Sequence, residues 1–201
     1  MKLTLCILVV AATLGAEENF QPLFNGRNLD GWDVDTASLW QVRDGLIVGK
    51  SPGLSYNEFL RTKKHYSDFI LKAKIRIING KGNSGIQFRS KAVPDSHEVS
   101  GYQADAFPGL WGSLYDESRR NKTLASPQPE FLAKLDTTAW HSYIITAQGN
   151  HIRLELDGTT TVEYHEKDPG IETTGFIGLQ VHASREPIEV WFKDLVIRAL
   201  K

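Results

Sequence analysis

Apolar and polar residues alternate strictly along one long stretch of this chain. Between Ser67 and Asn79, five apolar side chains fall on one side of an extended backbone and three cationic side chains fall on the other. A period of two is typical of a β-strand with one buried face. We therefore predict a long, half-buried strand over residues 67–79.

A second alternating stretch ends in a strong turn signal. Residues 152–157 alternate apolar with charged side chains, and Asp157-Gly158 follows them directly. Asp-Gly between two alternating runs indicates a tight β-hairpin, and Gly149-Asn150 gives a similar signal upstream. Residues 140–165 are therefore predicted to form a three-stranded meander.

The rest of the chain is also typical of short strands. The further strands that we predict span residues 40–42, 46–49, 85–89, 101–107, 175–182 and 189–198. Residues 116–124 are compatible with a single helical turn, and no segment carries a longer helical stripe. Many short strands between Gly, Pro and Asp turns predict an all-β fold, an antiparallel β-sandwich or jelly roll, as one domain over residues 20–200.

The first residues resemble a secretory signal peptide. Lys2 is followed by the apolar run 3–14 and by Gly15-Ala16. The run is shorter than the roughly 20 residues of a membrane-spanning helix, so we expect cleavage of residues 1–16 and no stable membrane insertion. A buried N-terminal helix or strand is the alternative. The expected location is secreted or periplasmic.

Composition excludes several classes of protein. The 201 residues are 41% hydrophobic and 23% charged, with a formal net charge of −1. This near-neutral balance offers no broad basic surface for nucleic acid. Cys6 is the single cysteine. A metal site built on several cysteines is therefore excluded.

Four predicted strands carry hydrogen-bonding side chains in place of the Lys, Glu and Thr of an ordinary solvated face. The pairs that share a face are Gln87 with Arg89, Gln103 with Asp105, Gln180 with His182, and Trp191 with Lys193. If the strands are neighbours, these side chains line one concave surface. Such groups bind sugar hydroxyls, and aromatic rings stack on the apolar face of a sugar. A plain solvated sheet face is the alternative.

A charged and aromatic segment, residues 112–122, forms a second candidate region. It lies behind Trp111 and contains Tyr115, Asp116 and Arg119. We expect Asp116 and Arg119 to order the site, because charged loops on a rigid sheet often carry function. Glu117, in the same segment, fits a salt-bridged surface turn equally well.

Short motifs along the whole chain resemble those of the 3-keto-disaccharide hydrolase family. In order they are Phe24-Asn-Gly26, Leu29-Asp-Gly-Trp32, Asn83-Ser-Gly-Ile-Gln-Phe-Arg89, Gly101-Tyr-Gln-Ala-Asp105, Gly112-Ser-Leu-Tyr-Asp116, Gly178-Leu-Gln-Val-His182 and Val190-Trp-Phe-Lys-Asp-Leu195. The resemblance covers residues 20–199. It implies a concanavalin A-like β-sandwich that acts on glycosides oxidised at C3, and an upstream sugar 3-dehydrogenase as pathway partner.

The chemistry that the resemblance implies needs a base, an acid and a group that stabilises an enolate. A C3 ketone acidifies the C2 proton, and its removal allows the C1 substituent to leave. His182 is our candidate base, with Arg89 or Lys193 at the enolate. Asp105 would orient His182, act as the acid, or bind a divalent metal ion together with His182. The other expected carbohydrate contacts are Gln87, Gln103, Trp111, Tyr115, Asp116, Arg119, Gln180 and Lys193. A carbohydrate-binding sandwich without catalysis is the alternative.

Overall fold

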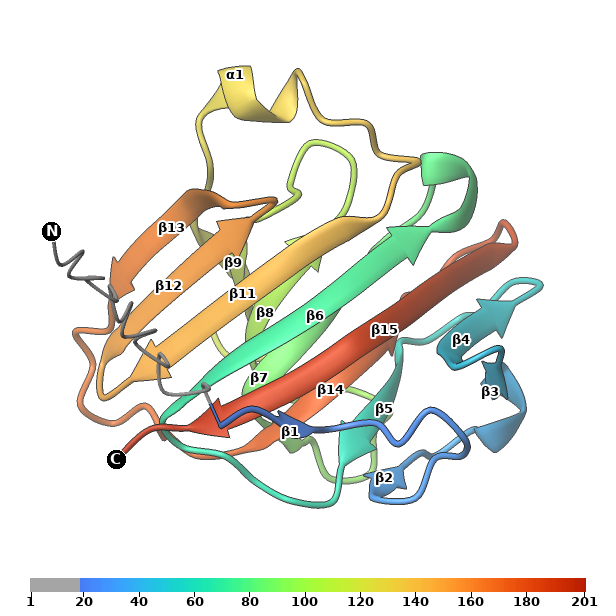
Figure 1. The fold of residues 1–201 in the computed structure, drawn as a ribbon, viewed down its shortest axis with the longest axis horizontal. Helices are drawn as coiled ribbons and strands as arrows, with labels where there is room; N and C mark the ends of the chain where they lie inside the picture. The colour runs from blue at the N-terminus through green and yellow to red at the C-terminus, as the bar shows by residue number, and fades with distance from the viewer. Residues whose placement is uncertain (1–18) are drawn as a thin grey trace, which may run out of the picture.

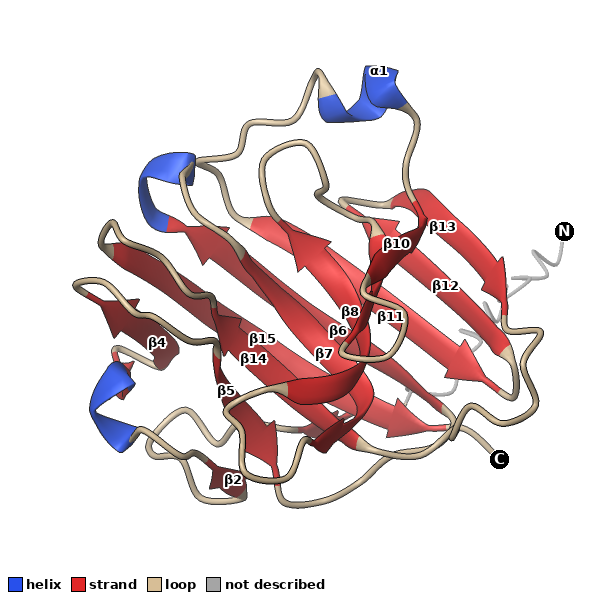
Figure 2. Ribbon diagram, turned by 180° about the vertical axis from the view of Figure 1, so that it is seen from behind, coloured by secondary structure: helices blue, strands red, loops and turns tan. Residues whose placement is uncertain are grey.

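Two antiparallel β-sheets pack face to face in this protein (Figures 1 and 2). The computed structural model describes residues 19–201, so the predicted signal peptide, residues 1–16, lies outside the described residues. Within the described part, helical structure is limited to the short helix α1 (Pro129–Leu132) and two 3₁₀ turns, Ala37–Leu39 and Ile78–Gly80. The predicted all-β antiparallel sandwich is confirmed.

Sheet A has the strand order β13-β12-β11-β6-β15-β4-β3, with β1 paired to β15. Its strands are β1 (Gln21–Pro22), β3 (Trp40–Arg43), β4 (Leu46–Ser51), β6 (Phe69–Ile77), β11 (His141–Gln148), β12 (His151–Leu156), β13 (Thr159–His165) and β15 (Ile188–Ala199).

Sheet B has the strand order β10-β9-β8-β7-β14-β5-β2. Its strands are β2 (Trp32–Asp33), β5 (Glu58–Thr62), β7 (Ser84–Ala92), β8 (Val99–Ala106), β9 (Leu114–Glu117), β10 (Lys122–Ala125) and β14 (Phe176–Val181).

An apolar core fills the space between the two sheets. In β6 every second side chain is buried, as the alternation of residues 67–79 predicts. Ile75 and Phe192 from sheet A and Phe88 and Leu179 from sheet B are fully buried in one cluster. The two sheets therefore hold together by excluding water from their facing sides.

The three-stranded meander predicted over residues 140–165 is confirmed by β11, β12 and β13, which pair in sequence. Asp157 and Gly158 have φ values of 50° and 77°. Positive φ at both central residues matches the strand twist at a two-residue hairpin, which explains the choice of Asp-Gly.

Residues 116–124 do not form the helical turn with which their sequence is compatible. This segment instead joins the hairpin of β9 and β10, in which Lys122 pairs with Asp116. Ser118 and Asn121 have positive φ, and the Ser118 amide donates to the Asn121 side chain at 3.0 Å. These left-handed residues reverse the chain tightly, so a helix cannot start here.

Arg89 does not share a face with Gln87, contrary to the sequence prediction. Arg89 and Ser90 together oppose a single residue of β8, and Arg89 has a φ of 48°. This β-bulge shifts the alternation by one position, so Ser90 takes the place beside Gln87 and donates to it at 2.8 Å.

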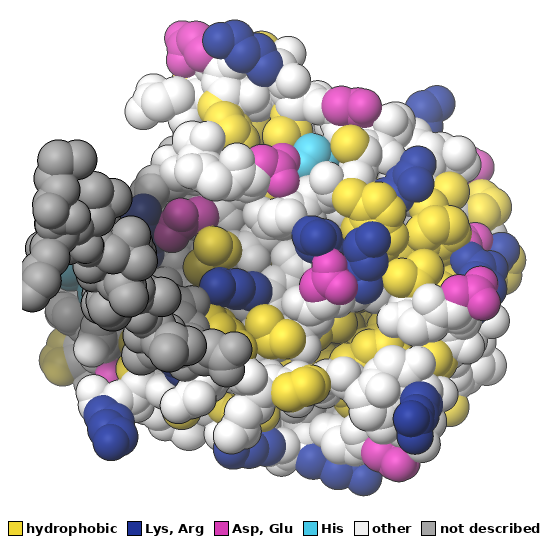
Figure 3. All heavy atoms as spheres, viewed as in Figure 1, with side chains coloured by type: hydrophobic (Ala, Val, Ile, Leu, Met, Phe, Trp, Pro, Cys, Tyr) yellow, Lys and Arg dark blue, Asp and Glu magenta, His cyan; other side chains and the backbone are white. Residues whose placement is uncertain are grey.

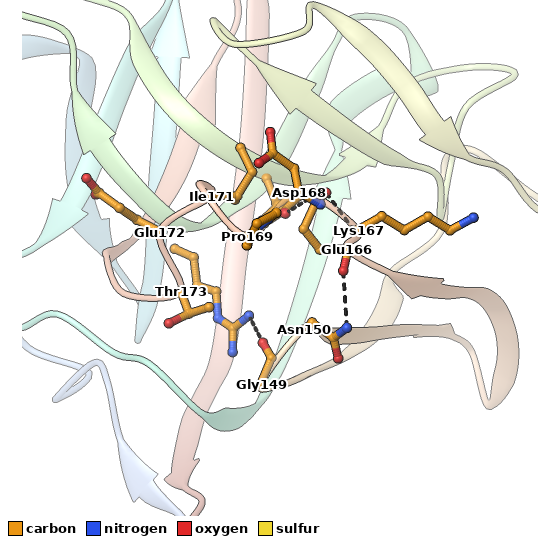
Figure 4. Close-up of a pocket in the computed structure, with 11 residues that line it drawn as sticks. Gly149, Asn150, Glu166, Lys167, Asp168, Pro169, Ile171, Glu172 and Thr173 are labelled. Carbon is orange, nitrogen blue, oxygen red and sulfur yellow. Dashed lines mark hydrogen bonds between the residues drawn. The ribbon is translucent and has the colours of Figure 1, made fainter.

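The Arg89 guanidinium instead ties together loops at one end of the sandwich. It donates to the Ser67 carbonyl at 2.8 Å, the Gly149 carbonyl at 2.7 Å and the Asp68 carboxylate at 2.8 Å. Beside it lies a pocket of about 280 Å³ under the segment 166–173 (Figure 4). All three donor groups of Arg89 are therefore committed to structure.

The predicted pairing of Trp191 and Lys193 with the polar strands is also wrong. Both residues lie on β15 in sheet A, on the face away from the core, which Figure 3 shows as a mixture of basic, acidic and hydrophobic side chains. The Lys193 ammonium sits 4.4 Å from the centre of the Trp140 ring. Alternation identified their face correctly but could not tell which sheet β15 joins.

We predict that Arg89→Leu lowers the free energy of unfolding by about 3 kcal/mol, because it leaves Asp68 and two carbonyls without their buried donor. Urea unfolding measures the change. Lys167→Leu, in the exposed wall of the same pocket, is the control, with an expected change within about 0.5 kcal/mol. Equal losses in both variants would contradict the structural role of Arg89.

Candidate functional site

A polar cleft opens on the outer face of sheet B, the face away from the core. It has a volume of about 220 Å³ and is lined by Asn57, Asn83, Gln103, Asp105, Phe107, Leu110, Tyr115, Glu117 and His182. The lining comes from the start of β5 and β7 and the ends of β8 and β14, with β9 alongside. Residues far apart in sequence therefore meet because four strands begin or end at one place.

A directed chain of hydrogen bonds runs along the sheet into this cleft. Ser90 donates to Gln87 Oε1 at 2.8 Å, Gln87 Nε2 donates to Gln103 Oε1 at 3.0 Å, and Gln103 Nε2 donates to Asp105 Oδ1 at 2.8 Å. We call these four residues the amide chain. All four are nearly or fully buried, so each polar group is satisfied by its neighbour rather than by water.

Glycines on the same face make room for the amide chain. A Cβ on Gly85 would lie 2.6 Å from the Gln103 side chain, and one on Gly178 would lie 3.2 Å from the Gln87 Cβ. A Cβ on Gly101 would collide with Ser90. Without these glycines the long amides would stand away from the sheet and could not bond along it.

Asp105 is held from its backbone as well as from its side chain. Its carbonyl accepts hydrogen bonds from Tyr143 Oη and from the Gly112 amide, and its amide donates to the Ser113 carbonyl. Only 4% of the residue is exposed, and burial raises the pKa of its carboxyl to about 7. The Gln103 donor lowers this pKa, but loss of hydration has the larger effect.

Glu117 is a second carboxyl group in the cleft with a raised pKa. It lies on β9 on the same face as Tyr115, and burial together with the negative charge of Glu98 raises its pKa to about 7. Glu98 is itself held by Asn57 Nδ2, at 3.0 and 3.1 Å from its two oxygens. The cleft thus contains two carboxyl groups that keep protons close to neutral pH.

His182 presents one free nitrogen. Its Nδ1 lies 2.6 Å from the carbonyl oxygen of Ala183, which can only accept a hydrogen bond. Nδ1 therefore carries the proton, and in the neutral ring Nε2 is the acceptor. The Ala183 amide in turn donates to Asn57 Oδ1 at 2.9 Å, which fixes the segment that carries the imidazole.

The mouth of the cleft is partly apolar. Phe107 is 37% exposed and is the large hydrophobic residue that stands out on the surface of residues 19–201. It lies with Leu110 in the loop between β8 and β9, next to Asp105. An exposed aromatic ring beside hydrogen-bonding groups is typical of a surface that stacks on sugar rings.

Of the eight expected carbohydrate contacts, Gln103 and Tyr115 line the cleft and the other six do not. Gln87 is fully buried within the amide chain. Trp111 is 1% exposed and packs on the rings of His141 and Tyr143. Asp116 is fully buried and pairs with Arg119 at 2.5 Å, while Arg119 covers the Tyr102 ring. In β9 the side chains alternate, so Tyr115 and Glu117 face the cleft and Asp116 faces the other way.

Gln180 lies on the cleft side of sheet B but does not line the opening. Its side chain is fully buried, and neither atom of its amide has a hydrogen-bond partner. Asn83, in the cleft wall, also has a buried side-chain oxygen without a partner.

The sequence predictions missed Asn57, Asn83, Phe107 and Glu117 as cleft residues. Glu117 could have been found, because it stands two residues from Tyr115 on the same strand and therefore on the same face. Phe107 could also have been found, because it stands two residues from Asp105 in the strand predicted over residues 101–107. Asn57 and Asn83 lie just outside strands, where a period of two gives no direction.

Asp105 and His182 both line the cleft, as a shared metal ion would require. Within residues 19–201, however, no three His, Cys, Asp or Glu side chains are close enough to hold an ion together. The same residues include no helix with the length and apolarity needed to cross a membrane.

The family that this sandwich matches makes it a carbohydrate-active protein. The chain belongs to the 3-keto-alpha-glucoside-1,2-lyase-like domain family, whose pattern matches residues 19–198. The resemblance seen in the sequence motifs is therefore confirmed, while a search of curated proteins gives no match.

Solved structures from three groups share the fold. A glycosyl hydrolase-like protein of Parabacteroides distasonis is 22% identical, with a TM-score of 0.71 over 94% of this chain and 98% of its own. The carbohydrate-binding module CBM66 of Bacillus subtilis is 19% identical, with a TM-score of 0.67 over 86% and 98%. The β-glucanase of Bacillus licheniformis is 15% identical, with a TM-score of 0.61 over 90% and 97%.

The raised pKa of Asp105 predicts a loss of stability as the pH rises. The unfolded carboxyl ionises near 3.8, while the folded one holds its proton up to about pH 7. This contribution is therefore fully present below pH 3.8 and is lost as the pH rises through 7. It amounts to about 4 kcal/mol in all, of which about 3 kcal/mol lies between pH 4 and pH 7. Asp105→Asn cannot titrate, so the difference between parent and variant in urea unfolding at pH 4 and pH 7 isolates this contribution.

The control for this comparison is Asp95→Asn, because Asp95 is exposed in the loop between β7 and β8. It should change unfolding equally at both pH values. A pH dependence in Asp105→Asn as steep as that of the parent would show that the Asp105 carboxyl ionises normally.

Proposed function

We propose that this protein cleaves the glycosidic bond of 3-keto-glycosides by removing the C2 proton and eliminating the C1 substituent. One observation carries the proposal: a single cleft joins an imidazole nitrogen with a free lone pair to two carboxyl groups that hold protons near neutrality. Family membership supports the same chemistry. Carbohydrate processing follows from the family, and the keto-glycoside substrate is our proposal.

The proposed reaction uses His182 as base and Asp105 as acid. Nε2 of His182 takes the C2 proton, which the neighbouring C3 ketone has acidified, and an enolate forms. The enolate electrons then form the C1=C2 bond, the ketone is restored, and the C1–O bond breaks. The departing oxygen takes the proton of Asp105, which at neutral pH still carries one because of its burial.

Water addition across C1=C2 would complete a net hydrolysis, and we assign activation of the water to Glu117, which lines the cleft. The Asn83 amide, with its oxygen unpartnered, is available to a substrate hydroxyl. Arg89 and Lys193 lie outside the cleft, so neither is proposed at the enolate. The substrate requires prior oxidation at C3, which a sugar 3-dehydrogenase would supply. Export directed by residues 1–16 is part of the same proposal.

We predict that His182→Ala lowers kcat on a 3-keto-disaccharide at least about a hundredfold, because the general base is removed. Release of the free leaving sugar measures turnover. The matched control is His165→Ala, an exposed histidine at the end of β13. If the parent protein binds the sugar and leaves the glycosidic bond intact, it is a carbohydrate-binding protein and the proposed reaction is wrong.

Phe107 provides a test of how the substrate lies in the cleft. We expect Phe107→Ala to raise KM for a 3-keto-disaccharide about fivefold, through loss of stacking, while Phe107→Trp retains the parent KM. Phe20→Ala is the control, because it removes an aromatic ring that contacts Lys72 on sheet A, away from the cleft. It should leave the KM unchanged. An unchanged KM in Phe107→Ala would place the sugar elsewhere.

A further inference from the structure

The amide chain can satisfy its hydrogen bonds in two directions. A Gln side chain carries an oxygen at one position and an NH₂ at the other, and a 180° turn about its last torsion exchanges them. That torsion joins an sp³ to an sp² carbon and is soft. Gln87 and Gln103 can therefore both turn over without moving their strands.

The direction seen in the structure suits an ionised Asp105. Each member donates toward the cleft, and Gln103 Nε2 donates to Asp105 Oδ1 at 2.8 Å. In the opposite direction, a protonated Asp105 would donate to the Gln103 oxygen, Gln103 to the Gln87 oxygen, and Gln87 to Ser90 Oγ. The first distance is 2.8 Å, and the other two are 3.0 and 2.8 Å, so no heavy atom has to shift.

Ser90 supplies the end that makes the opposite direction complete. Its Oγ lies 3.0 Å from the Phe88 carbonyl as well as 2.8 Å from Gln87. When Gln87 donates to Ser90, the hydroxyl proton can turn to the Phe88 carbonyl. In either direction each side-chain nitrogen and oxygen of the chain keeps a hydrogen-bond partner, so the reversal adds no unpartnered buried atom, which is the usual cost of moving a proton inside a protein.

We propose that the amide chain is a two-state positioning device, whose direction reverses when Asp105 gains or loses its proton. Ser90, Gln87 and Gln103 are positioning residues, and Asp105 is the group that reaches the cleft. The burial that raises the pKa of Asp105 to about 7 brings both states into the range near neutral pH. The device would allow Asp105 to give up a proton and recover it while it stays hydrogen-bonded to Gln103 in both states.

Other ionisable groups face Asp105 and set the background of its titration. Tyr115 and Glu117 approach from β9, His182 from the end of β14, and Glu98 lies beyond Glu117. None of these is hydrogen-bonded to the amide chain. Their charges act on Asp105 through space and would do so whichever way the amides point.

The reversal gives an NMR signature in the protein without substrate. The carboxyl carbon of Asp105 reports its titration, and the side-chain nitrogens of Gln87 and Gln103 report the amides. We expect both amide signals to move with the midpoint of Asp105, and to stand still in Asp105→Asn. A Gln87 signal that ignores the titration of Asp105 in the parent protein would overturn the proposal.

Two variants separate the chain from an effect through space. Gln103→Met cuts the chain, so Gln87 should stop responding. The ionised Asp105 loses a charge-assisted hydrogen bond, which is stronger than the neutral bond that the protonated form loses, so its pKa should rise by about one unit. Ser90→Ala leaves the reversed Gln87 NH₂ without an acceptor. A buried orphan N–H is tolerated less well than an orphan carbonyl, so the pKa should fall. These opposite shifts are not expected of a merely structural role.

Gln180→Met is the matched control, a buried glutamine on the same face outside the chain. It should leave the Asp105 midpoint and the Gln87 response unchanged. A Gln87 response that survives in Gln103→Met, or pKa shifts of the same sign in the two chain variants, would refute the reversal. The catalytic role of the reversal rests on the proposed function, but these titrations need no substrate. If the protein does not turn over a 3-keto-disaccharide, the titrations still test the reversal.

Discussion

Long amide side chains that lie flat on a β-sheet must bond to one another, because the backbone groups beneath them are already used within the sheet. Here that constraint shapes one face of the molecule. Glycines leave room for Gln87 and Gln103 to lie along sheet B, and Ser90, turned to this face by a bulge, starts the chain. The amide chain ends on Asp105, which lines the cleft. The glycines and the bulge therefore help to determine the surroundings of the Asp105 carboxyl, although they lie several residues away from it.

The pKa of Asp105 is set by two opposing effects, and loss of hydration, which raises it, outweighs the hydrogen bond from Gln103, which lowers it. Asp105 receives one donated hydrogen bond and faces the charge of Glu117, and both carboxyls have a pKa near 7. A carboxyl group of ordinary acidity would be ionised at neutral pH and could not serve as an acid. The proposed elimination uses this property directly, with the imidazole of His182 as the complementary base.

Bulges and sheet membership explain why the sequence placed some residues wrongly. Alternation along β7 put Arg89 beside Gln87, but one extra residue in the strand turned Arg89 to the loops that it now holds. Alternation along β15 grouped Trp191 with Lys193 correctly, yet β15 belongs to sheet A, whereas the cleft strands belong to sheet B. A local pattern contains no information on either event, because both depend on which strand is the neighbour.

The sequence by itself determined the all-β sandwich, the meander of β11 to β13 and the family, because these follow from local periodicity, turn residues and ordered motifs. It also selected Gln103, Asp105, Tyr115 and His182, which the structure brings to one cleft. Only the tertiary structure decided that Asn57 and Asn83 join them and that Trp111, Asp116 and Arg119 do not. Strand ends and loops meet at the cleft because strands that are distant in sequence pair with one another. Burial raises the pKa of Asp105 and Glu117, and it exists only once those pairings have formed.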